Sequence, residues 1–193
     1  MKKFNTKEDA FTGLEAAIVL IAFVVVAAVF SYVVLGAGFF TTQKAQEVVH
    51  SGVSQAASNI IVKGEVYGIA DEKNETIGII QFDVGLAAGG MPIDMGKTTL
   101  VWSTQLDAPY QMEYDNQLAT PENTGKWNIT YRSPSSNTNE LLETNEIFTV
   151  QVYPKTNVTP RGQFNLEIKP EVGASLGIQR TLPAGLTPTT MLY

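Results

Sequence analysis

The feature that most constrains this chain is an uncharged, strongly apolar stretch that runs from Ala16 to Gln43, near the N-terminus. Its first part, AAIVLIAFVVVAAVFSYVVL, has Ser31 and Tyr32 as its only polar side chains. A helix of about 20 apolar residues, rising about 1.5 Å per residue, is long enough to cross the hydrocarbon layer of a bilayer. The stretch therefore predicts a helix that is covered by lipid or by other protein.

The helical pattern continues beyond this stretch. Apolar residues recur at spacings of three and four, which marks one apolar stripe on a helix. They are Ala45, Val48, Val49, Val53, Ala56, Ala57, Ile60 and Ile61. We predict one helix from about Leu14 to Val62, ended by Gly64 and roughly 70 Å long. Gly36 and Gly38 each weaken a helix interior by about 1 kcal/mol relative to Ala, so we expect a bend or a loosened turn there.

The remainder of the chain has the pattern of a β-domain. Strand-like runs, several of which alternate apolar with polar residues, follow one another without intervening helices. They are EVYGIA, TIGIIQFDV, TTLVWSTQL, KWNITYRS, EIFTVQVYP, FNLEIKP and SLGIQRTL. Trp102 and Trp127 fall on these runs and are expected in the core. The predicted fold class is α+β, a long N-terminal hydrophobic α-helix followed by an antiparallel immunoglobulin-like β-sandwich.

Composition excludes several classes of function. The 193 residues carry a formal net charge of −6 and no run of basic residues, so we predict no nucleic-acid partner. Cysteine is absent, which removes disulfides, thiolate metal sites and cysteine nucleophiles. His50 is the one histidine, so a histidine-based triad or a site with several histidine ligands cannot form. We therefore predict neither an enzyme nor a cofactor.

Acidic residues gather in two predicted turns. Asp71, Glu72 and Glu75 lie close together in one, and Asp83 and Asp94 flank another. Loop carboxylates can bind calcium, but the spacing of an EF-hand is missing. A solvated acidic loop is the preferred interpretation, and we predict no metal site.

The N-terminal segment admits three interpretations. A secretory signal that is removed whole would be cleaved near the small residues 36–38, although the apolar run is longer than such signals carry. A permanent single-span membrane anchor is the second interpretation. In the third, cleavage between Gly13 and Leu14 removes only the polar beginning of the chain and leaves the entire helix on the mature protein.

Three segments carry a resemblance to a known family. The segment GLEAAIVLIAFVVVAAVFSYVVLGAGFFTTQKAQE resembles the processing site and polymerisation helix of archaellins, the subunits of the archaeal motility filament. Type IV pilins share this layout. GGMPIDMGKTTLVW is similar to the archaellin turn that leads into a strand, and FNLEIKPEVGASLGIQRTLP to the closing hairpin of the family. Archaellins commonly carry Lys or Arg just before the cleaved glycine, whereas Phe11 and Thr12 precede Gly13 here.

The resemblance implies three parts, a cleaved signal segment (1–13), a hydrophobic polymerisation helix (14–63) and an outer immunoglobulin-like β-sandwich (64–193). It implies a structural subunit of the archaellum that polymerises by helix-bundle packing in the filament core. Its implied partners are identical or related archaellin subunits, the signal peptidase for archaellins and pilins, and motor and assembly proteins at the base. The subunit would be membrane-inserted before assembly and would then belong to an extracellular surface filament. The alternatives are a type IV adhesion pilin and a membrane-anchored surface binding module that never polymerises.

The resemblance also assigns residues. Cleavage is expected at Gly13 and Leu14. The expected filament core comprises Ile18, Leu20, Ile21, Phe23, Val24, Val25, Val29, Phe30, Val33, Leu35, Phe39 and Phe40. Glu15 carries the only charge between the cleavage site and Lys44, and we expect it to partly neutralise the new α-amino group. The alternative for Glu15 is a solvated boundary residue.

Three Asn-X-Ser/Thr triplets begin at Asn74, Asn128 and Asn157. All of them lie outside the predicted helix, as expected for an exported domain. Such triplets also arise by chance in a chain rich in Asn and Thr. Archaellin glycosylation makes these three residues candidate N-glycosylation sites.

Overall fold

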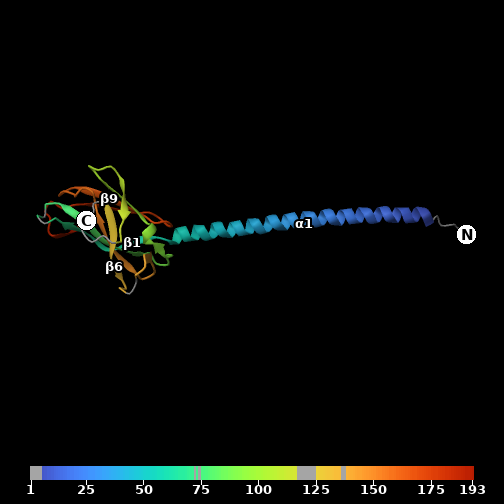
Figure 1. The fold of residues 1–193 in the computed structure, drawn as a ribbon, viewed down its shortest axis with the longest axis horizontal. Coiled ribbons are helices and arrows are strands. Elements are labelled where there is room, and N and C mark those ends of the chain that lie inside the picture. The colour runs from blue at the N-terminus through green and yellow to red at the C-terminus, as the bar shows by residue number, and fades with distance from the viewer. Residues whose placement is uncertain (1–5, 72, 74, 117–124, 136–137) are drawn as a thin grey trace. The chain divides into compact units, whose positions relative to one another are not determined.

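The computed structural model describes residues 6–193 except for residues 72, 74, 117–124 and 136–137, with side chains from Gly13 onward. The chain divides into two compact units, Met1–Ser51 and Gly52–Tyr193. The described residues of the first unit are helical. The second unit contains the end of the same helix and all the strands (Figure 1).

Helix α1 spans Thr6–Ala57 and is drawn in blue to blue-green in Figure 1. Its predicted start at Leu14 is wrong, because residues 6–13 contain no proline and the helix extends back through them. The predicted loosened turn near Gly36 and Gly38 is also wrong, since the helix is α-helical throughout. The Thr42 hydroxyl donates a hydrogen bond to the Gly38 carbonyl oxygen at 2.8 Å, which links the side chain to the backbone across this turn.

The predicted end of the helix at Val62 is wrong as well. Helix α1 stops at Ala57, and strand β1 (Ile60–Ala70) begins three residues later. Ile60 and Ile61 fit the apolar spacing of a helix, but β-branched residues also suit a strand, and pairing with β2 decides the outcome. Gly64, at φ +85°, lies at an irregularity inside β1 and is not a helix stop.

The β-domain has a principal sheet and a two-stranded ribbon within the described residues. Besides β1, the strands are β2 (Ile77–Leu86), β3 (Ile93–Asp94), β4 (Thr99–Thr104), β5 (Tyr110–Tyr114), β6 (Lys126–Ser133), β7 (Leu141–Leu142), β8 (Ile147–Tyr153), β9 (Gln163–Lys169), β10 (Leu176–Thr181) and β11 (Thr189–Leu192). The principal order is β10-β9-β4-β5-β6-β8-β2-β1-β11, and β3 pairs with β7. Each predicted run overlaps one strand, whereas β3, β5, β7 and β11 were not predicted.

Two antiparallel halves make up the principal sheet. They are β10-β9-β4-β5 and β6-β8-β2-β1-β11, and they meet at a short parallel pairing in which Tyr114 lies opposite Trp127. Buried apolar residues from both halves form a single core cluster. The predicted α+β class, with a β-sandwich after a long helix, is confirmed.

Both tryptophans lie in the core, as predicted. The Trp102 ring stacks on Phe164 with ring centroids 4.9 Å apart, and the Trp127 ring packs against Tyr114 at 4.6 Å. Neither tryptophan is measurably exposed. Burial raises the pKa of the Tyr114 hydroxyl, and its 2.8 Å hydrogen bond to Glu140 raises that pKa further. This tyrosine is therefore a neutral donor at the edge of the core.

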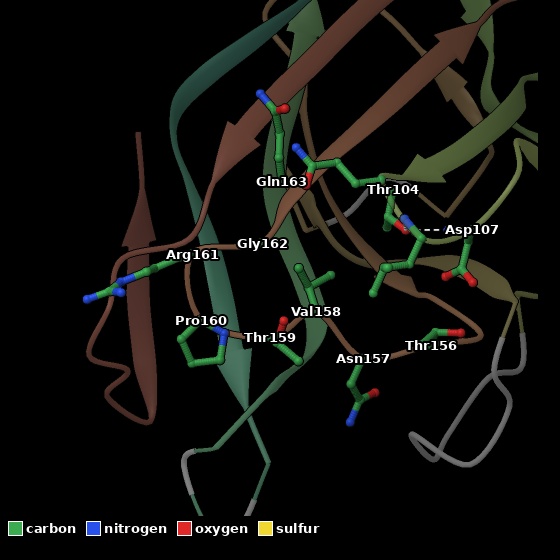
Figure 2. Close-up of a pocket in the computed structure, with 12 residues that line it drawn as sticks. Thr104, Asp107, Thr156, Asn157, Val158, Thr159, Pro160, Arg161, Gly162 and Gln163 are labelled. Carbon is green, nitrogen blue, oxygen red and sulfur yellow. Dashed lines mark hydrogen bonds between the residues drawn. The ribbon is translucent and has the colours of Figure 1, made fainter.

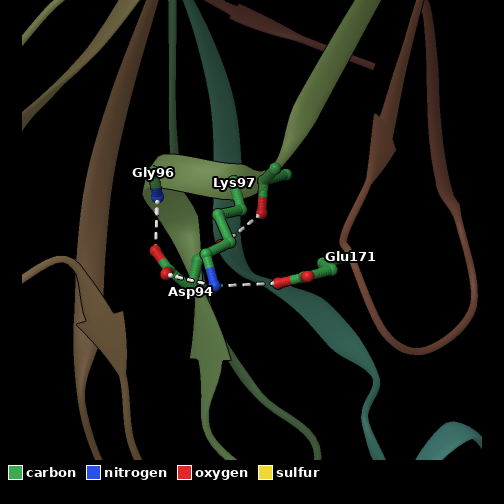
Figure 3. A network of polar contacts seen from close by, with 5 residues as sticks. Asp94, Gly96, Lys97 and Glu171 are labelled. Carbon is green, nitrogen blue, oxygen red and sulfur yellow. Dashed lines mark hydrogen bonds and ion pairs between the residues drawn. The ribbon is translucent and has the colours of Figure 1, made fainter.

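The motif GGMPIDMG forms a turn that is tied to a distant loop (Figure 3). The Asp94 carboxylate accepts a hydrogen bond from the Gly96 N–H at 3.0 Å, which caps the short 3-10 helix η1 (Met95–Lys97). The Lys97 ammonium lies 3.5 Å from the Asp94 carboxylate and 3.3 Å from that of Glu171. Both carboxylates raise the pKa of Lys97, with Glu171 the larger cause. The network holds η1 against the loop that joins β9 to β10.

Candidate functional site

The chain's most prominent functional feature is the bare apolar surface of α1. Exposed fractions of the predicted filament-core residues run from 55% at Val25 to 76% at Phe23. The part of α1 from Gly13 to Ala57 is long and apolar enough to cross a membrane. Soluble monomers rarely expose contiguous apolar patches beyond a few hundred Å². A surface of this kind requires lipid or other protein chains around it.

The second half of α1 keeps an apolar stripe beside charged residues. Val48, Val49 and Val53 are each about 60% exposed. Lys44 and Glu47 form an exposed ion pair at 2.7 Å, which contributes little to stability because both groups remain hydrated. The part of the predicted stripe that contains Val48, Val49 and Val53 therefore lies on an exposed helical surface, whereas Ile60 and Ile61 of that stripe lie in β1.

The proposed cleavage site lies inside α1. The helix runs without interruption through Gly13, Leu14 and Glu15, and Leu14 is 61% exposed. A methyl group added at Gly13 would meet nothing within 4 Å. Among the described side chains of α1, none covers the peptide bond between Gly13 and Leu14, although a protease would have to open one helical turn to reach it.

The three candidate glycosylation residues have different settings. Asn74 lies outside the described residues. Asn128 lies within β6 and is only 5% exposed, so a glycan could not be attached to its amide in the folded domain. Asn157 is exposed between β8 and β9, and its Nδ2 donates a hydrogen bond to the Thr76 hydroxyl at 3.1 Å. The accessible asparagine of this set in the described residues is Asn157.

A pocket of about 250 Å³ lies beside Asn157 (Figure 2). Its lining comes from Thr104–Asp107 and Thr156–Gln163 and is mostly hydroxyl, amide and aliphatic. The side chain of Arg161 points away from it in Figure 2, and the Oδ2 atom of Asp107 is buried without a hydrogen-bond partner. One carboxylate without a neighbouring nucleophile or base gives this pocket no catalytic arrangement.

The acidic residues named from the sequence have roles within the fold. The Asp71 carboxylate accepts backbone N–H groups of Glu75, at 2.8 Å, and Thr76, and the hydrogen bond from Glu75 is the main reason that the Asp71 pKa is lowered. Asp83 accepts a hydrogen bond from the Thr149 hydroxyl at 2.7 Å. Glu72 lies outside the described residues. Across the described residues there is no group of three or more histidine, cysteine, aspartate or glutamate side chains that could hold a metal ion.

Comparisons with known proteins agree with these features. Residues 10–180 match the family model described as archaeal-type flagellin. The chain is 39% identical to "Probable flagellin 1" of Archaeoglobus fulgidus, over 98% of both chains.

Two solved structures are similar to the fold. The archaeal flagellum of Methanospirillum hungatei strain JF1 matches with a TM-score of 0.73 and 39% identity, over 94% of this chain and 99% of that chain. Archaeal flagellin FlaB1 of Methanocaldococcus jannaschii matches with a TM-score of 0.58 over 70% of this chain and 97% of that chain, at 19% identity, and shows the fold alone.

The family match covers most of α1 and most of the β-domain, and the relative from Archaeoglobus fulgidus matches along nearly the whole chain. The resemblance read from the three sequence segments is thereby confirmed. The chain belongs to the archaeal-type flagellin family and is a structural subunit of an archaellum filament, not an enzyme.

Proposed function

We propose that the chain polymerises through α1, whose apolar side chains face lipid before assembly and other copies of α1 in the core of an extracellular filament. The observation that carries the proposal is the exposure of every predicted filament-core side chain in the single subunit. An adhesion pilin and a non-polymerising surface module are not favoured, because the family and the solved filament point to the archaellum.

The transfer of α1 from lipid into the filament core is favourable only when close packing and other proteins assist it. Removing a large apolar side chain from water is worth about 1.5–3 kcal/mol, so the twelve predicted core residues give a gross term on the order of tens of kcal/mol against water. Against lipid the gain is much smaller, because lipid tails are as apolar as the side chains. Close packing at small residues such as Ala27, Ala28 and Ser31 would add to it. We infer that separate assembly and motor proteins act at the base of the filament.

We further propose that signal peptidase removes residues 1–13. These residues are charged, and they would otherwise lie at the apolar end of a helix bundle. Their removal takes away three lysines, one glutamate and one aspartate, so the formal net charge changes from −6 to −7. The mature helix then begins at Leu14 and ends at Ala57, and the outer domain begins at Ser58.

The intact mass and the N-terminal residue of subunits from purified filaments test this processing. A subunit that begins at Leu14 supports the proposal. Filaments whose subunits still begin at Met1 would overturn it, and subunits that begin after residue 38 would show that the first part of α1 is removed as a secretory signal.

Glu15 would occupy the second position of the mature chain. Free backbone N–H groups in a first helical turn favour an anion by about 0.3–1 kcal/mol, and the new α-amino group of Leu14 would lie beside the carboxylate. We propose that Glu15 neutralises this amine as the helix end enters the filament core. A Glu15→Gln variant should be cleaved normally but assemble slowly, whereas a Glu47→Gln control, which changes a charge farther along α1, should assemble normally. Normal assembly of the Glu15→Gln variant would show that Glu15 is a solvated residue at the boundary of the apolar segment, without the proposed role.

Among the described residues, Asn157 is the glycosylation candidate that the fold supports. Its side chain is exposed, while Asn128 lies within the folded domain. Mass spectrometry of tryptic peptides should find a glycan on Asn157 and none on Asn128. A modified Asn128 would require attachment before the domain folds.

A further inference from the structure

Tyr32 is a polar side chain within the bare apolar surface of α1. It lies on the same side of the helix as Val25, Val29 and Phe39, because residues three, four and seven apart share one helical face. These three residues belong to the predicted filament core. Tyr32 itself is 80% exposed in the single subunit. A second chain that packs against this face of α1 therefore also covers the tyrosine.

Helix α1 offers no partner to the Tyr32 hydroxyl. The residues one turn away on the same face have no hydrogen-bonding side chain. They are Ala28, Val29, Leu35 and Gly36. The hydroxyls of Thr41 and Thr42, by contrast, each donate to a carbonyl oxygen four residues earlier at 2.8 Å. A short side chain can reach the backbone of its own helix in this way, whereas the tyrosine ring carries its hydroxyl outward, away from that backbone.

This hydroxyl is costly to bury alone. Moving a hydroxyl out of water without a replacement hydrogen bond is unfavourable, and buried tyrosine hydroxyls therefore usually have a partner. In a core made of α1 helices, the face that carries Tyr32 is closed to water. Because the tyrosine's own helix supplies no partner, the partner in such a core has to come from another chain.

The membrane-inserted subunit satisfies the same hydroxyl differently. Tyr32 lies about 24 Å along the helix from Ala16, where the uncharged stretch begins. The hydrocarbon layer of a bilayer is about 30 Å thick. A helix that enters this layer at Ala16 brings Tyr32 close to the opposite surface, where tyrosine hydroxyls meet head groups and water. Transfer of α1 into the filament core removes these partners.

We propose that the Tyr32 hydroxyl forms a hydrogen bond with an oxygen atom of α1 in a second copy of this chain, an inference that rests on the proposed function. The uncharged stretch of the neighbouring helix offers few such atoms. They are the side-chain oxygens of Ser31, Tyr32, Thr41, Thr42 and Gln43 and the backbone carbonyl oxygens, each of which has a second lone pair.

Such a bond fixes the axial position of one helix against the next. Packing among valine, alanine, leucine and phenylalanine side chains alone changes little when a helix slides, because one apolar neighbour replaces another. A polar group in an apolar helix interface is satisfied in few registers, and it selects these at some cost in stability. Tyr32 therefore sets the register between neighbouring copies of α1.

A Tyr32→Phe variant tests the bond, because it removes one oxygen atom and keeps the ring. Purified filaments are placed in mild detergent, and the release of subunits is followed by sedimentation. Release should be about five-fold faster or more, which corresponds to about 1 kcal/mol for one hydrogen bond. Tyr131→Phe, which removes an exposed hydroxyl from β6, is the matched control and should change the rate by about two-fold or less.

The opposite sign would overturn the proposal. Phenylalanine is more apolar than tyrosine, so a Tyr32 hydroxyl without a partner predicts that Tyr32→Phe filaments release subunits at the same rate or more slowly. A reconstruction of the unaltered filament provides a second test. The Tyr32 hydroxyl should lie within about 3 Å of an oxygen of a neighbouring α1, and contact with carbon atoms alone would contradict the bond. If the unaltered chain forms no filaments, the proposed function fails, which is a different result.

Discussion

Gly173, in the loop between β9 and β10, lies directly against the backbone carbonyl group of Ser58, where the chain leaves α1. A Cβ atom on Gly173 would overlap the Ser58 carbonyl oxygen, and φ at Gly173 is +114°. Ser58 is only 2% exposed, and Asn59 forms a parallel bridge with Ala174. The residues that follow the helix are thus held by a loop that comes more than a hundred residues later.

A Gly173→Ala substitution should destabilise the β-domain. The backbone strain costs about 1–3 kcal/mol, and displacement of the Ser58 segment adds to it, so the free energy of unfolding should fall by about 2 kcal/mol or more. Trp102 and Trp127 are the only tryptophans, so their fluorescence during urea unfolding of dissociated subunits reports on this domain alone. Gly177→Ala, whose added methyl group meets nothing within 4 Å, is the matched control and should change the midpoint little. Equal midpoints for both variants would contradict the close contact.

The ends of the elements show where sequence reasoning stops. An uncharged run from Ala16 to Gln43 leaves few alternatives to a helix. Ile60 and Ile61 suit both a helix stripe and a strand, and only the pairing of Ile60 with Leu86 decides between them. Strand β11 was not predicted because its pairing of Leu192 with Val66 joins the two ends of the β-domain, which no local pattern reveals.

The functional residues also fall into two groups, those that the sequence predicts and those that depend on strand pairing. The exposure of the α1 side chains could be predicted from the number and spacing of the apolar residues. The β-domain has a hydrophobic core of its own, so it does not need these side chains to fold. The burial of Asn128 could not be read from its triplet, because the triplet defines a chemical group and not its position in the sheet. The hydrogen bond from Thr149 to Asp83 depends on the register of β2 and β8, which are 60 or more residues apart along the chain.

Asp71 should make the turn after β1 sensitive to acid. Its pKa is lowered chiefly by the hydrogen bond from the Glu75 N–H, so the ionised carboxylate stabilises the turn at pH values above the ordinary value of about 3.9. That contribution is lost as the pH falls through the lowered pKa. Asp71→Asn should therefore lower the thermal midpoint at pH 7, and its difference from the unaltered chain should shrink below about pH 4. Glu75→Gln removes a charge from the same turn but keeps the N–H donor, so it should have little effect. If the difference in thermal midpoint between Asp71→Asn and the unaltered chain does not change with pH, the ionised Asp71 carboxylate does not stabilise this turn.

The β-domain should fold without α1 if β1 is kept whole. A fragment of residues 58–193 retains Ile60, which is 4% exposed, and the Asn59 carbonyl that accepts from the Ala87 N–H at 2.9 Å. It should be a soluble monomer with a cooperative unfolding transition. A fragment of residues 66–193 lacks half of β1 and should be less stable by about 2–5 kcal/mol, as expected for the loss of a buried isoleucine. Chemical unfolding of both fragments measures the difference, and equal stabilities would show that the first half of β1 is dispensable.

A Val25→Asp substitution should abolish polymerisation and leave the β-domain folded. Val25 is 55% exposed in the single subunit, so the change places the carboxylate at an exposed position and not in a core of the chain itself. In a dry helix bundle every copy would bury a carboxylate, at a cost of several kcal/mol unless it is neutralised. Val25→Leu, which keeps the apolar character, should still form filaments visible by electron microscopy. Normal filaments from Val25→Asp would place this residue outside the core.

The most direct measurement is a three-dimensional reconstruction of the purified filament by electron cryomicroscopy. The predicted result is a central bundle of α1 helices that begin at Leu14, with Val25 and Phe30 in contact with neighbouring helices and the β-domains arranged outside. A filament whose core is built from β-domains, or in which α1 lies on the surface away from other copies, would contradict the role assigned to this helix.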